Sequence, residues 1–192
     1  MSEMPARLRR WIRVEYDQLI DIGIFLPGDK VELLGGQLCV SEPQNSPHAA
    51  AICLADEALR QVFAGGWSIR VQLPIALDQE SEPEPDLTVV SGGPRDYLAD
   101  HPTRPVLVVE VADSSLALDR EHKGSLYARA RLREYWIVNL AERVVEVYRE
   151  PGPDATAFFG WAYRSIERLH AEQSITPVAA PTTRIAVADL LP

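Results

Sequence analysis

The feature that most constrains the fold of this chain is a nearly continuous apolar run at residues 106–111, with the sequence VLVVEV. A strand with one face in water would alternate apolar and polar residues, so this run is typical of a strand covered on both faces. A helical pattern at about residues 116–131 and a second apolar segment at 135–140 follow it. A strand, a helix and a strand of these lengths predict a right-handed crossover between parallel strands.

The rest of the chain predicts further strands and two more helices around this unit. Helices are expected at residues 15–22 and, after the Ser46-Pro47 capping signal, at about 47–64. Turn signals and apolar patterns predict strands at 31–34, 37–40, 67–77, 86–91 and 144–149, with short strands at 161–166 and 184–187. We therefore expect one α/β domain over residues 1–192, with a central mixed sheet flanked by helices, a core at about 14–150 and C-terminal strands and a tail at 151–192.

The composition restricts the partners of the protein. No stretch approaches the roughly 20 apolar residues of a membrane span, so we expect a cytoplasmic protein without membrane contacts. The formal net charge of -9 argues against a protein that coats nucleic acid, because phosphate binding relies on Lys and Arg. Five cations nevertheless gather around one expected helix, either as a solvated face or as a phosphate-binding surface; they are Arg120, Lys123, Arg129, Arg131 and Arg133.

Two carboxylates stand in strands of the buried type. Asp86 opens one apolar strand, and Glu110 lies inside the run at 106–111. Such carboxylates are energetically costly unless they are paired or bind a cation. A hard divalent cation, Mg²⁺ or Mn²⁺, would take their oxygens, lower the pKa of a bound water and neutralise charge on a scissile phosphate. With Lys123 nearby to activate the water or hold the phosphate, these residues indicate a metal-dependent phosphodiester-cleaving site.

Other residues could support this site. Lys123 shares a helix face with Asp119 and Tyr127, because the three are spaced i, i+4 and i+8. Glu32, in the expected hairpin, is a plausible extra metal ligand or ligand-orienting group. His48, at the start of its helix, could bind phosphate or position a ligand. The structural alternatives are an exposed hairpin residue for Glu32, a hydrogen-bonded core histidine for His48 and core packing for Tyr127.

The acidic pair and the lysine have structural alternatives as well. Asp86 could be a turn aspartate after a proline. Glu110 could form a structural ion pair with Arg120, although burying an ion pair is rarely stabilising. Lys123 could be a plain partner of Asp119 on a solvated helix face, and Asp119 could cap or orient the helix.

Between about residues 16 and 148 the chain carries an ordered set of short segments: VELLGG at 31–36, PH at 47–48, EPDL at 84–87, VVEV at 108–111, SS at 114–115, DR at 119–120, Lys123, LYARA at 126–130 and EYWIV at 134–138. This set resembles the Uma2 family, formerly the domain of unknown function 820 (DUF820), a bacterial branch of the PD-(D/E)XK nuclease superfamily. The resemblance implies a restriction-endonuclease-like domain. It implies that Asp86 and Glu110 match the metal-binding acidic positions, that Glu32 matches an N-terminal acidic position and that Lys123 matches a lysine carried on the helix.

The chain departs from the pattern of these nucleases at three positions. The lysine of the superfamily usually lies two residues after the second acid, where this chain has Ala112, so catalysis would require Lys123 to act from another element. Arg131 stands where the family usually has glycine, and Asn139 stands where it usually has aspartate. These two changes should affect a turn more than the site, although Arg131 adds positive charge.

Three hypotheses follow. The first is a Mg²⁺- or Mn²⁺-dependent endonuclease that acts on nucleic acid, with DNA as the expected substrate and, by analogy, as a homo-oligomer such as a dimer. The second is a catalytically inactive nuclease-fold module that binds nucleic acid or protein, which the net charge of -9 and Ala112 favour. The third is hydrolysis of a small phosphate ester, which an acidic surface would tolerate better.

Overall fold

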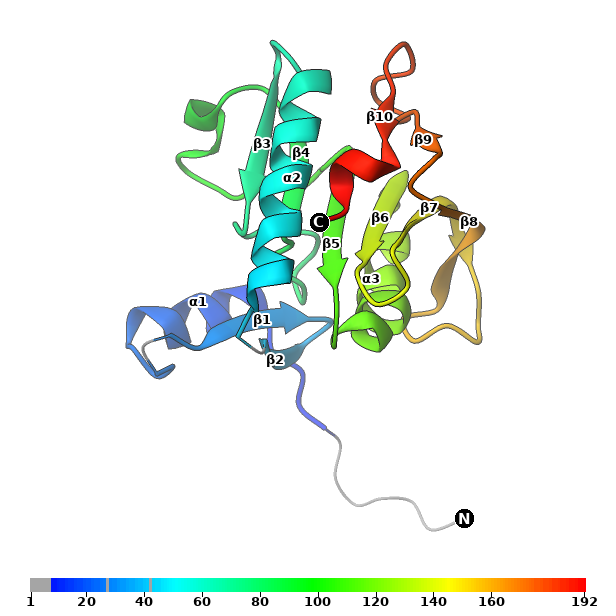
Figure 1. The fold of residues 1–192 in the computed structure, drawn as a ribbon. Helices are drawn as coiled ribbons and strands as arrows, with labels where there is room; N and C mark the ends of the chain where they lie inside the picture. Colours follow the sequence, from blue (N-terminus) through cyan, green and yellow to red (C-terminus); the bar gives the residue numbers. More distant parts are fainter. Residues whose placement is uncertain (1–7, 27, 42) are drawn as a thin grey trace.

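The computed structural model describes residues 8–26, 28–41 and 43–192. A six-stranded mixed sheet with helices on both faces confirms the expected α/β fold (Figure 1). β5 and β6 run parallel, and all the other neighbouring strands of this sheet are antiparallel. In spatial order the strands are β3 (Trp67–Val71), β4 (Leu87–Ser91), β5 (Leu107–Ala112), β6 (Glu134–Asn139), β7 (Val144–Pro153) and β8 (Trp161–Leu169).

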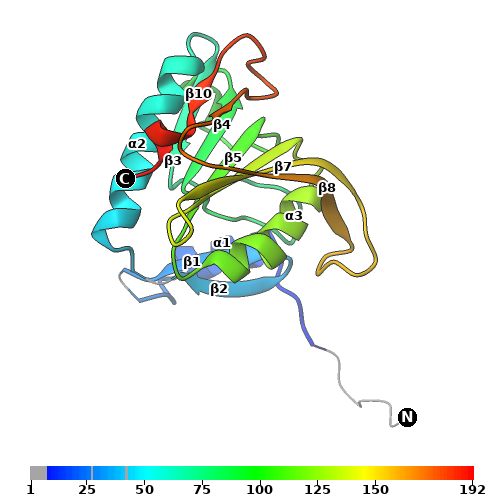
Figure 2. The same cartoon turned by 45° about the vertical axis from the view of Figure 1, so that its right-hand side comes forward.

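The two faces of the sheet are covered by different helices (Figures 1 and 2). Helix α2 (Ser46–Val62) packs its apolar stripe against one face, where Val109 and Val111 of β5 point. The segment between β5 and β6 packs against the other face, where Val108 and Ala112 point. The apolar run of β5 is therefore buried from both sides, as a strand without polar alternation requires.

The crossover between β5 and β6 differs from the single α-helix expected at residues 116–131. Its middle, η2 (Leu118–Lys123), is a π-helix, and α3 (Gly124–Arg129) continues it. Arg131 then takes a left-handed backbone conformation with φ 58°, which ends the helix and turns the chain into β6. Single π-helical turns occur frequently at functional sites, and this one carries Asp119 and Lys123, both buried.

A small N-terminal unit lies at the end of the sheet where β5 finishes (Figure 1). It consists of α1 (Arg13–Asp21) and a hairpin of β1 (Lys30–Leu34) and β2 (Gln37–Ser41), as the sequence predicts. Backbone hydrogen bonds between Leu33 and Glu82 tie the hairpin to the chain that leads into β4. This attachment brings Glu32 of β1 to the end of the sheet.

Two expectations need correction, one about the length of a strand and one about the extent of the core. The strand expected at residues 67–77 ends at Val71, because Gln72 adopts a left-handed conformation with φ 51° and Pro74 cannot donate to a ladder. The core, expected at about 14–150, extends further, because β8 belongs to the central sheet and C-terminal apolar side chains join the α2 face. The remaining elements are η1 (Pro94–Tyr97), β9 (Ser174–Ile175), β10 (Ile185–Ala186) and η3 (Val187–Leu190).

None of the helices in the three described ranges is both long enough and apolar enough to span a membrane.

Candidate active site

A pocket of about 390 Å³ opens at the carboxyl end of β5, between the N-terminal hairpin, the start of α2 and η2. Its lining is strongly acidic, whereas Lys30 and Lys123 are its only lysine or arginine residues among those described. The six carboxylates of the lining are Glu32, Glu84, Asp86, Glu110, Asp113 and Asp119. The pocket therefore combines the predicted metal-binding acids with further negative charge, which is the electrostatic setting of a cation site.

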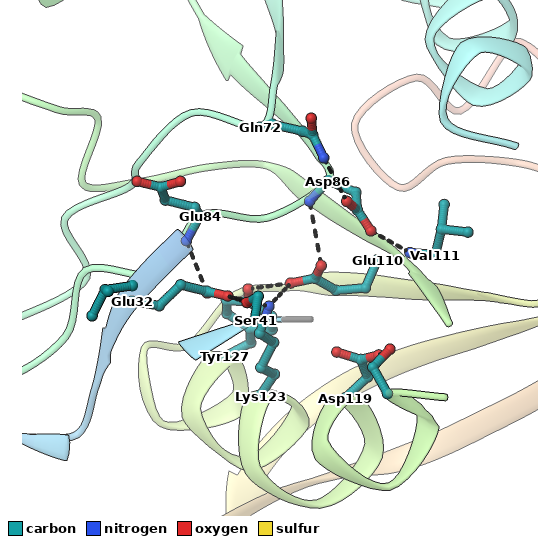
Figure 3. A network of polar contacts seen from close by, with 12 residues as sticks. Glu32, Ser41, Gln72, Glu84, Asp86, Glu110, Val111, Asp119, Lys123 and Tyr127 are labelled. Atoms are coloured by element: carbon teal, nitrogen blue, oxygen red, sulfur yellow. Dashed lines mark hydrogen bonds and ion pairs between the residues drawn. The ribbon is translucent and has the colours of Figure 1, made fainter. Parts of the chain in front are cut away.

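Asp86 and Glu110 face each other across two neighbouring strands. The antiparallel register pairs Leu87 of β4 with Val109 of β5, and its continuation places Asp86 opposite Glu110. The backbone N–H of Asp86 donates to Glu110 Oε2 at 3.3 Å, and the N–H of Val111 donates to Asp86 Oδ2 at 2.8 Å (Figure 3). The sheet itself therefore fixes the mutual position of the two carboxylates.

The other oxygen of Glu110 receives two donors from the crossover helix. Lys123 Nζ lies 3.1 Å from Glu110 Oε1, and the Tyr127 hydroxyl donates to the same oxygen at 2.8 Å (Figure 3). Lys123 Nζ also lies 3.2 Å from Glu32 Oε1. Lys123 therefore bridges two carboxylates in the pocket and is not a solvated partner of Asp119, and the alternative partner of Glu110, Arg120, pairs with Glu146 instead.

Glu32 is held in place from three sides. Its Oε1 accepts from the Ser41 hydroxyl at 2.9 Å and faces Lys123, while its Oε2 accepts from the backbone N–H of Glu84 at 3.0 Å. Glu32 is buried, and it is not an exposed hairpin residue. Its position makes it an orienting partner of Lys123, and the role of third metal ligand stays a prediction.

Asp86 is surrounded by three side-chain donors, of which the sequence analysis singled out only His48. His48 Nε2 lies 3.1 Å from Asp86 Oδ2, and because a carboxylate can only accept, this nitrogen carries the proton. The amides of Gln44 and Gln72 each donate to Asp86 Oδ1 at 3.3 Å. The sequence signals for His48 were its place at a helix start, where Asn45 caps its backbone N–H, and the PH segment at 47–48 in the family resemblance. No local pattern identifies the two glutamines, because loops bring them in.

Asp119 lines the pocket beside Lys123 but has a different set of partners. Its Oδ2 accepts from the Ser115 hydroxyl at 2.6 Å, and its backbone carbonyl accepts from the Tyr135 hydroxyl at 3.1 Å. These contacts hold the π-helical turn against the sheet. Asp119 is thus placed to orient the helix that carries Lys123.

The charges of the site are not balanced within the described chain. Burial raises the pKa of Glu110 to about 8; Lys123 opposes this shift, and the neighbouring carboxylates of Asp119, Asp86 and Glu32 add to it. Burial likewise raises the pKa of Asp119 to about 6. For Lys123, burial acts to lower the pKa, but the surrounding carboxylates outweigh burial and hold the pKa well above its usual value. One ammonium group is therefore shared among several buried acids.

The carboxylate oxygens at this site are ligands of the kind that a hard divalent cation prefers. In the described ranges, no group of three or more His, Cys, Asp and Glu side chains is arranged to hold a metal ion. Asp86 and Glu110 offer two carboxylates, and Mg²⁺ commonly binds one or two and keeps several waters. Glu110 Oε2 accepts one long hydrogen bond of 3.3 Å, so it has lone pairs available for a cation.

The chain is similar to known proteins at two levels. The model of the Uma2 family, described as "Putative restriction endonuclease", matches residues 13–188. A crystal structure of "a putative nuclease belonging to DUF820" from Anabaena variabilis shares the fold, with a TM-score of 0.65 at 15% identity over 84% of this chain and 89% of that chain. No curated protein matches the sequence.

Proposed function

We propose that this chain, which belongs to the Uma2 family, is an endonuclease. It would hydrolyse phosphodiester bonds of nucleic acid with Mg²⁺ or Mn²⁺. DNA is the proposed substrate. The observation that carries the proposal is the arrangement of Asp86, Glu110 and Lys123 around one acidic pocket, where two strands fix the carboxylates and the crossover helix supplies the ammonium group. Two carboxylates and one cationic side chain are the residue types that metal-assisted phosphodiester hydrolysis needs.

In this proposal the carboxylates of Asp86 and Glu110 would hold the cation. When bound, the cation would supply charge neutralisation at the phosphate and a more acidic water. His48 and the backbone N–H of Val111 keep the Asp86 carboxylate oriented. The Tyr127 hydroxyl does the same for Glu110 from the opposite side.

Lys123 acts in this proposal as a cation and not as a base. Glu110 and Glu32 hold its pKa well above the usual value, so the side chain is an ammonium group at neutral pH. An ammonium group donates hydrogen bonds to phosphate oxygens and stabilises negative charge that develops on them. Of the two roles expected from the sequence, the geometry favours holding the phosphate over activating water.

A second candidate function is a nuclease-fold module that binds nucleic acid or protein without cleaving it. One observation favours it: the polar groups of the site already satisfy one another. Asp86 accepts from four donors, and Lys123 is held by two carboxylates. A substrate would have to displace at least part of this network.

Plasmid nicking separates the two candidates. Purified protein is incubated with supercoiled plasmid and Mn²⁺, beside the isosteric variants Asp86→Asn and Glu110→Gln and the variant Lys123→Met. Glu57→Gln, on the exposed side of α2, is the matched control. The proposal predicts nicking by the wild type and the control and its loss in the three site variants. Nicking that persists in all three variants contradicts the site, and no cleavage of DNA or RNA together with no metal binding supports the binding module.

We also propose that the protein acts as a homodimer, because cleavage of both strands of a duplex is most direct with two sites. Light scattering coupled to size-exclusion chromatography tests this directly. A mass of twice the 21.4 kDa chain is expected, and a monomer at micromolar concentration would contradict it.

A further inference from the structure

A second pocket, of about 480 Å³, lies at the other end of β5 and β6 and has the opposite electrostatic character. Val106 and Arg133, the residues directly before the two parallel strands, both line it. Val106 is four residues from Glu110, which at the rise of a strand corresponds to about 13 Å along the sheet. We call this cavity the arginine pocket, because Arg104, Arg131 and Arg133 line it and none of its described lining residues is acidic.

The arginines of this pocket form no ion pairs with the described residues, and Arg104 and Arg133 are available to a ligand. Neighbouring Arg149 is paired with Glu134, whose Oε1 is 2.6 Å from the guanidinium. In contrast, within residues 8–26, 28–41 and 43–192, Arg104, Arg131 and Arg133 take part in no ion pair and donate no side-chain hydrogen bond. In a chain with a net charge of -9, three such cations around one cavity form a strongly localised positive potential.

The backbone at Arg131 adds a separate observation. Its φ of 58° lies in the left-handed region, which for a residue other than glycine is unfavourable by about 1 kcal/mol or more. The conformation lets Arg131 end the helix beside the arginine pocket, while its guanidinium lies 5.6 Å from the ring centroid of Trp161, which does not line this pocket. Arg131 therefore adds positive charge near the pocket, and Arg104 and Arg133 are the two guanidinium groups that would contact a ligand.

The chemistry of the lining selects the ligand. Guanidinium groups bind phosphate through parallel N–H donors, and Thr103 adds a hydroxyl to the lining. The rest of the lining includes apolar side chains such as Leu77, Val106 and Leu132, which would cover an uncharged part of the ligand. The volume is in the range of pockets that bind small organic molecules.

We infer that the arginine pocket binds a phosphomonoester attached to a largely apolar or aromatic group, of about the size of a nucleoside monophosphate. The phosphate contacts Arg104 and Arg133, Arg131 contributes charge from the helix end, and the organic group rests on the apolar side chains. This site is separate from the acidic pocket and does not depend on the proposed nuclease activity. The same phosphomonoester could be a free nucleotide or the phosphorylated end of a nucleic-acid strand.

Calorimetric titration without added divalent metal tests the inference. The probes are AMP, adenosine, inorganic phosphate, and a short single-stranded DNA with and without a 5′-phosphate. The variants are Arg104→Ala and Arg133→Ala, with Arg95→Ala as the matched control, because Arg95 is an exposed arginine in η1, within the same β4–β5 connection as Arg104 and outside the pocket. Lys123→Met reports on binding at the acidic pocket instead.

AMP is expected to bind more tightly than phosphate or adenosine, and each pocket variant is expected to weaken AMP binding about tenfold. Arg95→Ala and Lys123→Met should leave AMP binding unchanged, so this test can succeed even if no nuclease activity exists. Tighter binding of the phosphorylated DNA than of AMP would identify a strand end as the source of the ligand. Absence of AMP binding at millimolar concentration, or equal weakening by Arg95→Ala, overturns the inference. Circular dichroism of each variant confirms that it is folded.

Discussion

The acidic pocket and the polar cluster around the buried Glu146 receive their cations from the same π-helical segment η2, and they differ in how the charge of their buried acids is compensated. In the acidic pocket, Lys123 is shared by Glu32 and Glu110, and burial raises the pKa of Glu110 to about 8. On the β7 side, Glu146 is also shielded from solvent but lies less deeply in the protein than Glu110, and it is paired with Arg120 and accepts from Asn139 and Tyr148.

The pKa of Glu146 shows what full compensation does. Burial acts to raise it, but the hydrogen bonds from Arg120, Asn139 and Tyr148 outweigh burial and lower the pKa below its usual value. A buried carboxylate with enough donors is a structural element, whereas carboxylates left in excess are placed for an external cation. The comparison therefore favours a stabilising role for the Glu146 cluster and supports the proposed cation site in the acidic pocket.

The largest expected effect concerns activity. Glu110→Gln should reduce plasmid nicking by about 10²–10³-fold, because it removes the negative charge of a proposed metal ligand and leaves the shape of the side chain unchanged. Glu146→Gln should leave nicking per folded molecule unchanged. Equal loss of activity in both variants, measured on samples of equal folded fraction, would break the distinction between the clusters.

The next effect concerns stability. Arg120→Met leaves Glu146 buried without its cation, and we expect the free energy of unfolding to fall by about 2 kcal/mol, less than for a fully buried pair because Arg120 is partly exposed. Urea unfolding measures the change. A loss below about 0.5 kcal/mol, the range of ordinary surface substitutions, would show that Arg120 does not compensate Glu146.

The third effect is a pH dependence of opposite sign in the two clusters. An acid whose pKa is raised by folding binds its proton more tightly in the native state, so its contribution to stability falls as the pH rises from about 4.5 to about 8. Glu110→Gln should therefore flatten the decline of the melting temperature over this range in metal-free buffer. Glu146 has a lowered pKa, so its contribution to stability is lost as the pH falls through the usual titration range of a glutamate and below it. Glu146→Gln should therefore flatten the decline of the melting temperature at acidic pH. If the melting temperature falls equally steeply with pH in the wild type and in Glu110→Gln, Glu110 is not the origin of the decline.

The smallest effect concerns the orientation of Glu110. Tyr127→Phe removes one hydroxyl donor at 2.8 Å, while Lys123 still contacts the same oxygen. We expect Mn²⁺ affinity to weaken by about tenfold, as for other residues that orient metal ligands. An unchanged affinity would mean that Lys123 alone orients the carboxylate.

The sequence predicted the parts of the fold and the site that depend on local patterns. The apolar run of β5 and the Gly-Gly hairpin each correspond to an element of the structure, and the capping signal predicted α2, although the N-cap is Asn45 and not Ser46. The placement of Glu110 and Lys123 on consecutive elements also followed from spacing. The proximity of Glu32 to Lys123 was expected from the family resemblance and not from physical pattern.

The rest depends on contacts between distant segments. The π-helical turn, the left-handed Gln72 and the glutamine donors to Asp86 leave no periodic signal in the sequence. The five basic residues around the crossover helix also show that distant contacts cannot be predicted from local patterns, because these residues do not form one common surface. Arg120 pairs with Glu146, and Lys123 lies in the acidic pocket. Arg131 and Arg133 line the arginine pocket.

Calorimetric titration with Mn²⁺ is the most direct test of the claim that the acidic pocket is a cation site. The account predicts one ion bound per chain, with affinity weakened at least about tenfold by Asp86→Asn and by Glu110→Gln but retained in Glu146→Gln. Absence of Mn²⁺ binding by the wild type, or binding that survives both pocket substitutions, would contradict it.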